Sequence, residues 1–196
     1  MSKRKRALKA SYLRHYYHNG SLWRVNTGRS GLYREMLKPM LLQLFTMLEH
    51  HNKLLIVRFD CHQDHSTESS DHISKFINKL TKRLKWKYNL CRVGYNWTRE
   101  QEKAKHQHYH FVLMIDGNKA QHPFHILQIA KQIWQDQEMG NTFSIAPNPF
   151  YHFKRGDVDT LQQVIWRISY LAKGRGKGYR SPQAKDYSTS RIKPPV

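Results

Sequence analysis

Residues 105–117 constrain the fold of this chain more than any other stretch. From Tyr109 onward the run is apolar and rich in aromatic and β-branched side chains, and it closes on Asp-Gly, a pair typical of turns. This pattern predicts a buried strand that ends in a turn. Because side chains alternate between the two faces of a strand, His108 and His110 point the same way, roughly 7 Å apart, and His106 continues their row.

Two imidazoles at this spacing can hold one cation between them. The chain has thirteen histidines, so a chance His-x-His pair at the start of a strand explains the pattern equally well on its own. A structural zinc site is not favoured, because Cys61 and Cys91 are the two cysteines and form no Cys-x-x-Cys pair.

The composition points to a polyanionic partner. The formal net charge is +20 and the sequence pI is about 10.1, which makes nucleic acid the first candidate. No stretch approaches the roughly 18 uncharged apolar residues of a membrane span. Two cysteines fit a reducing compartment. We therefore expect an intracellular, cytoplasmic protein with no membrane contact.

The chain divides into a folded middle and two basic ends. Residues 1–31 are basic and aromatic with glycine breakers, which predicts a loosely packed extension that is either solvated or in contact with DNA. Residues 32–180 are expected to form one domain. Residues 181–196 are expected to be a basic flexible tail.

Hydrophobic periodicity within the middle predicts an α+β fold. Helices are expected over 32–50, 71–88, 123–139 and 157–173, and strands over 54–60, 91–101 and 109–116. The segment 143–153 is interrupted by Pro147 and Pro149, which predicts a loop with at most a short strand at 151–153.

The strand 91–101 and the histidine strand are joined by a few polar residues around 102–105, which favours a hairpin. Since a slip of one residue turns every side chain to the other face, the aromatic rows should coincide, with Trp97 opposite Phe111. This register places Glu100 opposite His108, where it is either a third metal ligand or one half of a cross-strand ion pair. One carboxylate and two imidazoles suit Mn²⁺ or Mg²⁺.

Asp60 is a possible addition to this site. It ends the strand 54–60 and shares a face of it with Arg58. Asp60 therefore either lies beside the metal, pairs with an arginine or caps the strand.

A second set of candidate residues lies on the helix 157–173. Tyr170 falls opposite the apolar stripe, with Lys173 and Trp166 within about one turn of it. This arrangement is consistent with a tyrosine nucleophile and a cationic partner. With eleven tyrosines in the chain, an ordinary half-exposed tyrosine is the competing interpretation. Tyr179 is a rival nucleophile in a glycine-rich setting that would hold it less precisely.

Basic residues after this helix are candidate phosphate contacts. Arg175, Lys177 and Arg180 lie among glycines, as in flexible segments that bind the DNA backbone without reading bases. Exposed aromatic side chains such as Trp166 or Tyr95 could stack on unpaired bases, although such residues more often belong to a core.

Taken together, these motifs resemble a known superfamily. His108-Tyr109-His110 is similar to the His-hydrophobe-His signature of the HUH endonucleases, and residues 170–173 (YLAK) resemble their Tyr-x-x-Lys motif. Residues 94–101 (GYNWTREQ), followed by the histidine run, resemble the inovirus-type replication proteins of filamentous phages and the related YagK/YfjJ C-terminal domain family. The resemblance spans roughly residues 54–173.

The resemblance implies an RRM-like antiparallel sheet flanked by helices, with the metal strand central. It implies a rolling-circle replication initiator that nicks and rejoins single-stranded DNA, using Mn²⁺ or Mg²⁺ and leaving a 5′-phosphotyrosyl link and a free 3′-OH. His108 and His110 would be metal ligands, with Glu100 as the third. Tyr170 would be the nucleophile and Lys173 its partner.

The resemblance also implies a bacterial setting, in which a host helicase would unwind the DNA. Gly174 stands one helical turn after Tyr170, where a second motif tyrosine would lie, so a single-tyrosine enzyme is favoured. A single-tyrosine transposase or relaxase would share this chemistry. A non-catalytic DNA-binding regulator would account for the charge but not for the motifs.

Overall fold

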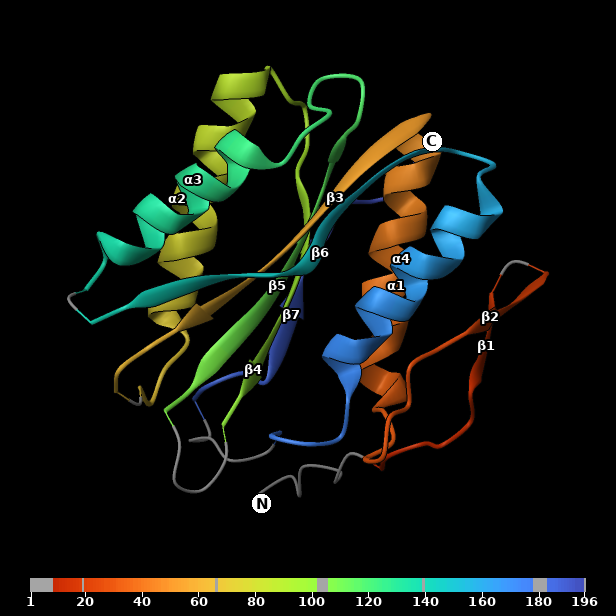
Figure 1. Cartoon of the computed structure of the whole chain (residues 1–196), viewed down its shortest axis with the longest axis horizontal. Helices are drawn as coiled ribbons and strands as arrows, with labels where there is room; N and C mark the ends of the chain where they lie inside the picture. Colours follow the sequence, from red (N-terminus) through yellow and green to blue (C-terminus); the bar gives the residue numbers. More distant parts are fainter. Residues whose placement is uncertain are drawn as a thin grey trace.

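The fold is that of a computed structural model, which describes residues 9–18, 20–65, 67–101, 106–138, 140–177 and 183–195. Over these residues the chain has the predicted α+β architecture. A five-stranded antiparallel sheet stands between two pairs of helices (Figure 1). None of the helices in the described ranges is both long and apolar enough to span a membrane.

The histidine strand lies at the centre of this sheet. Within the described chain the strand order is β6 (Thr142–Lys154), β3 (Lys53–His62), β5 (His108–Asp116), β4 (Gly94–Glu100) and β7 (Tyr187–Thr189). From Phe111 to Ile115, β5 carries buried apolar side chains on both faces, which suits a position covered by helices on either side.

The register between β4 and β5 confirms the prediction from the aromatic rows. Trp97 lies opposite Phe111, and Glu100 lies opposite His108. The connecting residues 102–105 lie outside the described part of the chain.

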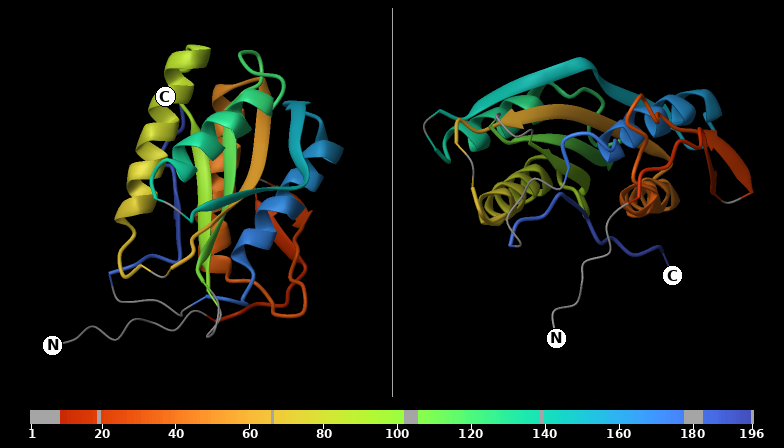
Figure 2. Two further views of the ribbon diagram at one scale, coloured as in Figure 1. Left: turned by 60° about the vertical axis from the view of Figure 1, so that its left-hand side comes forward. Right: turned by 90° about the horizontal axis from the view of Figure 1, so that it is seen from below.

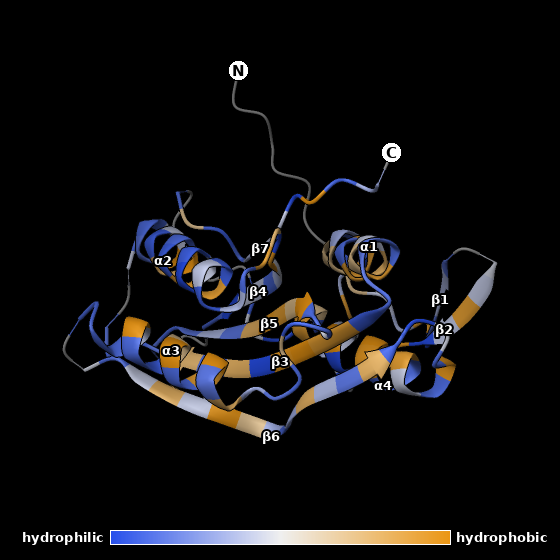
Figure 3. Cartoon of the chain, turned by 90° about the horizontal axis from the view of Figure 1, so that it is seen from above, coloured by the Kyte–Doolittle hydropathy of each residue, from blue (hydrophilic) through white to orange (hydrophobic). Residues whose placement is uncertain are grey.

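The helices cover the two faces of the sheet in pairs. Helices α2 (Asp71–Tyr88) and α3 (Phe124–Gln135) cover one face, and α1 (Arg34–His50) and α4 (Val158–Ser169) cover the other (Figure 3). Each pair buries its own apolar cluster against the strands. Asp157 is the N-cap of α4, because its side chain accepts a hydrogen bond of 3.0 Å from the Thr160 N–H.

Residues 9–31 and 183–195, as far as the structure describes them, contain more regular structure than the sequence predicted. Strands β1 (His15–His18) and β2 (Ser21–Arg24) form a hairpin beside α4 (Figure 2). Trp23 and Val25 enter the core shared with α1. At the other end, β7 adds to the sheet beside β4 instead of forming a flexible tail. Short elements of this kind depend on distant partners, which local patterns do not encode.

Strand β6 corrects the prediction of a loop over 143–153. It runs for thirteen residues along β3, with an irregularity opposite Arg58. Pro147 and Pro149 lie in this irregularity, where they interrupt no regular ladder, and β6 is an edge strand. The bulge moves β6 away from the middle of β3 and opens a hollow there.

The last helix also ends earlier than predicted. The α-helix stops at Ser169, and Tyr170–Ala172 continue as a 3-10 turn. This turn carries the candidate nucleophile.

The aromatic core beneath α2 and α3 should dominate stability. The Phe111 ring stacks on Phe59 at 5.1 Å and meets Phe76 edge-on at 5.2 Å. We expect Phe111→Ala to lower the free energy of unfolding by about 3–5 kcal/mol, as measured by urea denaturation. Trp86→Ala is the control, since Trp86 is 85% exposed and should change stability by about 0.5 kcal/mol at most. Equal losses in the two variants would contradict this core.

Candidate metal centre

One face of β5 changes from apolar to polar along its length. Val112 and Met114 pack in the core beneath α1 and α4, while His110 and His108 continue the same row toward the start of the strand. Glu100, at the end of β4, is brought to this row by the register described above.

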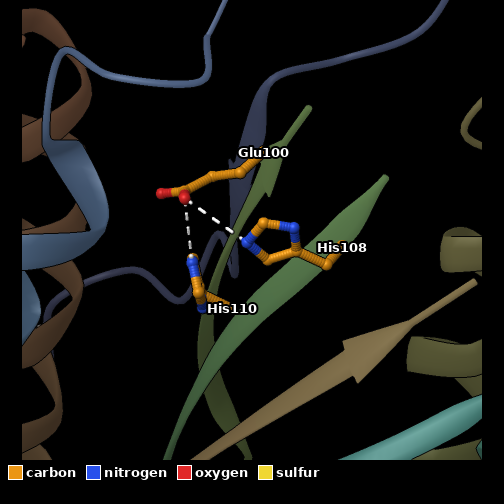
Figure 4. Close-up of side chains that lie close together, drawn as sticks. All are labelled: Glu100, His108 and His110. Atoms are coloured by element: carbon orange, nitrogen blue, oxygen red, sulfur yellow. Dashed lines mark ion pairs between the residues drawn. The ribbon is translucent and has the colours of Figure 1, made fainter. Parts of the chain in front are cut away.

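Glu100, His108 and His110 converge on one point (Figure 4). Glu100 Oε2 lies 3.4 Å from His108 Nε2 and 3.2 Å from His110 Nε2. Their candidate ligand atoms all lie within 4.8 Å of one another, and no other such group of histidine, cysteine or acidic residues occurs in the described chain. The three residues predicted from the sequence are therefore brought together, in an arrangement that could hold a metal ion.

Asp60 and Arg58 lie behind His110. Asp60 Oδ1 lies 2.6 Å from His110 Nδ1, and it also pairs with the Arg58 guanidinium. Burial would raise the pKa of Asp60, but His110 and Arg58 together lower it to about 2. The ionised carboxylate can accept the proton of Nδ1, which leaves the Nε2 lone pair available to a cation.

Arg58 Nη2 also lies 2.8 Å from His110 Nδ1. A guanidinium can only donate, so it bonds this nitrogen only in the other tautomer, with the proton on Nε2. A cation at Nε2 would therefore select the tautomer that donates to Asp60. Asp60 thus orients His110 and forms an ion pair with Arg58, and it is not one of the three candidate ligands.

The chemistry of these groups fits a divalent metal. His110 Nε2 is buried, and apart from the Glu100 carboxylate at 3.2 Å it has no polar partner among the described residues. Burial would raise the pKa of Glu100, but the two histidines and Lys177 hold it well below its ordinary value, so the carboxylate is ionised. A buried anion beside two imidazoles is a donor set suited to a cation.

Two further histidines lie outside the group. His106 is exposed and is not one of the converging residues. His62 lies opposite His108 on β3, and the two rings stack at 5.5 Å. The sequence analysis did not single out His62, although it follows Asp60 at the spacing of one strand face.

Tyr170 and Lys173 adjoin the metal-binding residues. Lys173 Nζ donates to Tyr170 Oη at 2.7 Å and lies 2.9 Å from Glu100 Oε2. The ring of Tyr170 lies 6.0 Å from that of His110. Burial would lower the pKa of Lys173, but the contacts with Tyr170 and Glu100 raise it above its ordinary value, so the ammonium stays charged.

The turn that carries Tyr170 is fixed by its neighbours. Leu171 and Ala172 are fully buried in the core beneath α1 and α4. Lys173 forms a β-bridge with Leu32, and the Gly174 N–H donates to Gly31 at 2.9 Å. A Cβ at position 174 would lie 2.5 Å from the Ser30 carbonyl oxygen, so this approach requires glycine. The segment predicted as a loose extension thus positions the tyrosine.

Of the residues predicted to contact DNA after this turn, the two that the structure describes, Arg175 and Lys177, do not share one environment. Lys177 is not on the surface, because its ammonium is buried 2.8 Å from Glu100 Oε1. Arg175 is exposed. Arg180 and the rival nucleophile Tyr179 lie outside the described residues.

The two aromatic candidates for stacking also differ. Trp166 is 42% exposed, whereas Tyr95 packs against the core beneath α2 and α3. Trp166 is therefore the exposed ring of this pair, and Tyr95 is half-buried.

The Lys177 ammonium forms a buried ion pair with the Glu100 carboxylate, and its charge would repel a metal ion bound there. We expect Lys177→Met to lower the free energy of unfolding of the metal-free protein by about 3 kcal/mol, because a buried ion pair is broken. The same change should strengthen Mn²⁺ binding about tenfold, because an ammonium no longer repels the metal. Urea denaturation and titration calorimetry measure the two effects. Lys185→Met, which removes an exposed charge, is the control, and weaker Mn²⁺ binding in Lys177→Met would contradict this role.

Comparison with known proteins identifies the family. The sequence profile of the YagK/YfjJ C-terminal domain matches residues 18–185. The chain belongs to the YagK/YfjJ C-terminal domain family. The match includes β2, the strands β3 to β6 and all residues of the candidate metal centre, so the YagK/YfjJ domain begins well before residue 32. No curated protein and no solved structure matches the chain.

Proposed function

We propose that this chain is a metal-dependent, single-tyrosine endonuclease of the HUH type, which nicks and rejoins single-stranded DNA and initiates rolling-circle replication. Mn²⁺ or Mg²⁺ is the proposed metal, with Glu100, His108 and His110 as its ligands. Tyr170 is the proposed nucleophile. Its product is a 5′-phosphotyrosyl link to the DNA strand together with a free 3′-OH.

One observation carries this proposal: the ammonium of Lys173 touches both halves of the site. It lies 2.7 Å from the Tyr170 hydroxyl and 2.9 Å from the Glu100 carboxylate. A candidate nucleophile, its cationic partner and a metal-binding group are therefore contiguous. A DNA-binding regulator has no need of such an arrangement.

The metal, when bound, would supply positive charge to the oxygens of the scissile phosphate. Tyr170 Oη would form the new bond to phosphorus as it gives up its proton. The bond from phosphorus to the 3′ oxygen would break, and that oxygen would gain a proton. Lys173 would stabilise the developing phenolate, because its ammonium already donates to Oη.

This reaction exchanges one phosphoester for another, so it is reversible in principle. The 3′-OH can attack the phosphotyrosine and rejoin the strand, which replication of a circular molecule requires at its end. The +20 charge supports binding of the DNA backbone. Strand separation would fall to a helicase of the host.

The experiment uses strands of the element's own origin, labelled at either end, incubated with protein and Mn²⁺. We expect the 5′-labelled strand to give a shorter free product with a 3′-OH, extendable by a polymerase. The 3′-labelled fragment should remain attached to protein after denaturation. Binding without cleavage under these conditions would instead support a regulator, and cleavage without attachment would support a water-dependent nuclease.

A further inference from the structure

Two adjoining hollows lie along β6 and α4, next to the candidate site. The first, of about 380 Å³, has His110 and Tyr170 among its lining residues. The second, of about 290 Å³, is lined by Arg24 of the N-terminal hairpin and Gln163 of α4. Neither hollow is lined by the metal ligands Glu100 or His108.

Two aromatic side chains join the hollows into one track. Trp166 and Tyr151 line both of them. Trp166 is 42% exposed, although it lies on a helix with a well-formed apolar face. The Arg24 guanidinium lies 5.8 Å from the centre of its ring. Exposed aromatic rings beside arginines are the usual means of binding unpaired bases and their phosphates.

The walls of this track are held by hydrogen bonds. Gln162 bonds the backbone of Arg24 in both directions, at 2.9 and 3.0 Å, which fixes the hairpin to α4. Arg167 donates to the carbonyl oxygen of Pro147 at 2.7 Å, which fixes α4 to the bulge of β6. The track is therefore formed before any ligand binds, and binding need not order it.

The charge of the track favours a polyanion. Arg24, Arg58 and Arg167 contribute to its lining. The one carboxylate among the lining residues is Asp60, and it is paired with Arg58 and His110. No unpaired negative charge therefore lines the described walls.

We propose that this track binds the nucleotides next to the scissile phosphate, with Trp166 as the ring on which a base stacks. The inference rests on the proposed function, in which Tyr170 attacks the scissile phosphate. The phosphate would therefore lie at the end of the track that Tyr170 lines. Trp166 would then be a residue that positions the DNA, separate from the proposed catalytic residues Tyr170 and Lys173. Asn26 is among the residues that line the first hollow, and its amide side chain can both donate and accept the hydrogen bonds that a base edge offers.

The test compares binding of two single strands of equal length, oligo(dT) and a strand that consists of abasic sites, in chelator so that no cleavage occurs. Wild-type protein should bind oligo(dT) more tightly. Trp166→Ala should weaken binding of oligo(dT) about tenfold and leave binding of the abasic strand unchanged, because only the base–indole contact is lost. Fluorescence anisotropy measures both affinities.

The matched control is Trp86→Ala, which removes a tryptophan that is 85% exposed on α2, across the sheet from α4. This variant should bind both strands as the wild type does. Trp166→Phe should restore most of the affinity for oligo(dT), since a ring is retained. Circular dichroism confirms that each variant is folded.

Three outcomes would contradict the proposed role of the track. They are equal affinity of the wild type for the two strands, unchanged affinity for oligo(dT) in Trp166→Ala, and an equal loss of affinity for both strands in Trp166→Ala. These outcomes are separate from failure of the proposed function. Suppose that Trp166→Ala loses affinity for oligo(dT) but not for the abasic strand, and that the wild type never cleaves DNA with metal. This result would support the track as a DNA-binding site and contradict the proposed nuclease activity.

Discussion

Replacing Tyr170 with phenylalanine should abolish strand cleavage while leaving DNA and metal binding intact. The change removes only the hydroxyl that lies 2.7 Å from Lys173. Loss of a nucleophile typically costs an enzyme about 10⁴-fold or more in rate. The single-turnover rate of cleavage of a labelled origin strand, at saturating Mn²⁺, measures the effect.

Two other tyrosines serve as controls for this variant. Tyr12 is 64% exposed and has no place in the site, so Tyr12→Phe should cleave at the wild-type rate. Tyr179→Phe tests the rival nucleophile and should also remain active. Full activity in Tyr170→Phe with loss in Tyr179→Phe would move the nucleophile to the later residue.

Removing one imidazole from the metal group should have the second large effect. His110→Ala deletes the buried Nε2 nitrogen that lies 3.2 Å from the Glu100 carboxylate. Its loss should weaken Mn²⁺ binding by more than the roughly 10- to 100-fold that an outer-shell partner contributes. Cleavage should fall with it. Titration calorimetry with Mn²⁺ gives the affinity directly.

His106→Ala is the matched control for that variant, because His106 lies in the same sequence row but is exposed and outside the converging group. It should bind Mn²⁺ with wild-type affinity. If His106→Ala and His110→Ala lost metal equally, or if neither did, the group defined by Glu100, His108 and His110 would not be the metal centre.

Much of this site could be predicted because strands impose a strict alternation. Once the aromatic rows of β4 and β5 were matched, Trp97 opposite Phe111 placed Glu100 beside His108 with no further information. The pair Tyr170 and Lys173 followed from helical spacing. It survives the change to a 3-10 turn, because residues three apart lie on the same side of that turn.

The parts that escaped prediction depend on contacts between distant segments. Lys177 looks like a surface cation in its glycine-rich sequence, and only the fold buries it against Glu100. The prolines of β6 suggest a loop until an edge position and a bulge are known to accommodate them. Trp23 similarly enters the core through a hairpin whose partners lie in α4.

The most direct test of the central claim is the chemical identity of the protein–DNA link. Wild-type protein, Mn²⁺ and the element's own origin strand would be denatured, digested with a protease and analysed by mass spectrometry. We predict DNA attached through a 5′-phosphate to the peptide that contains Tyr170, only in the presence of metal. An attachment to any other residue, or none with the correct origin supplied, would contradict the assignment of Tyr170 as a metal-supported nucleophile.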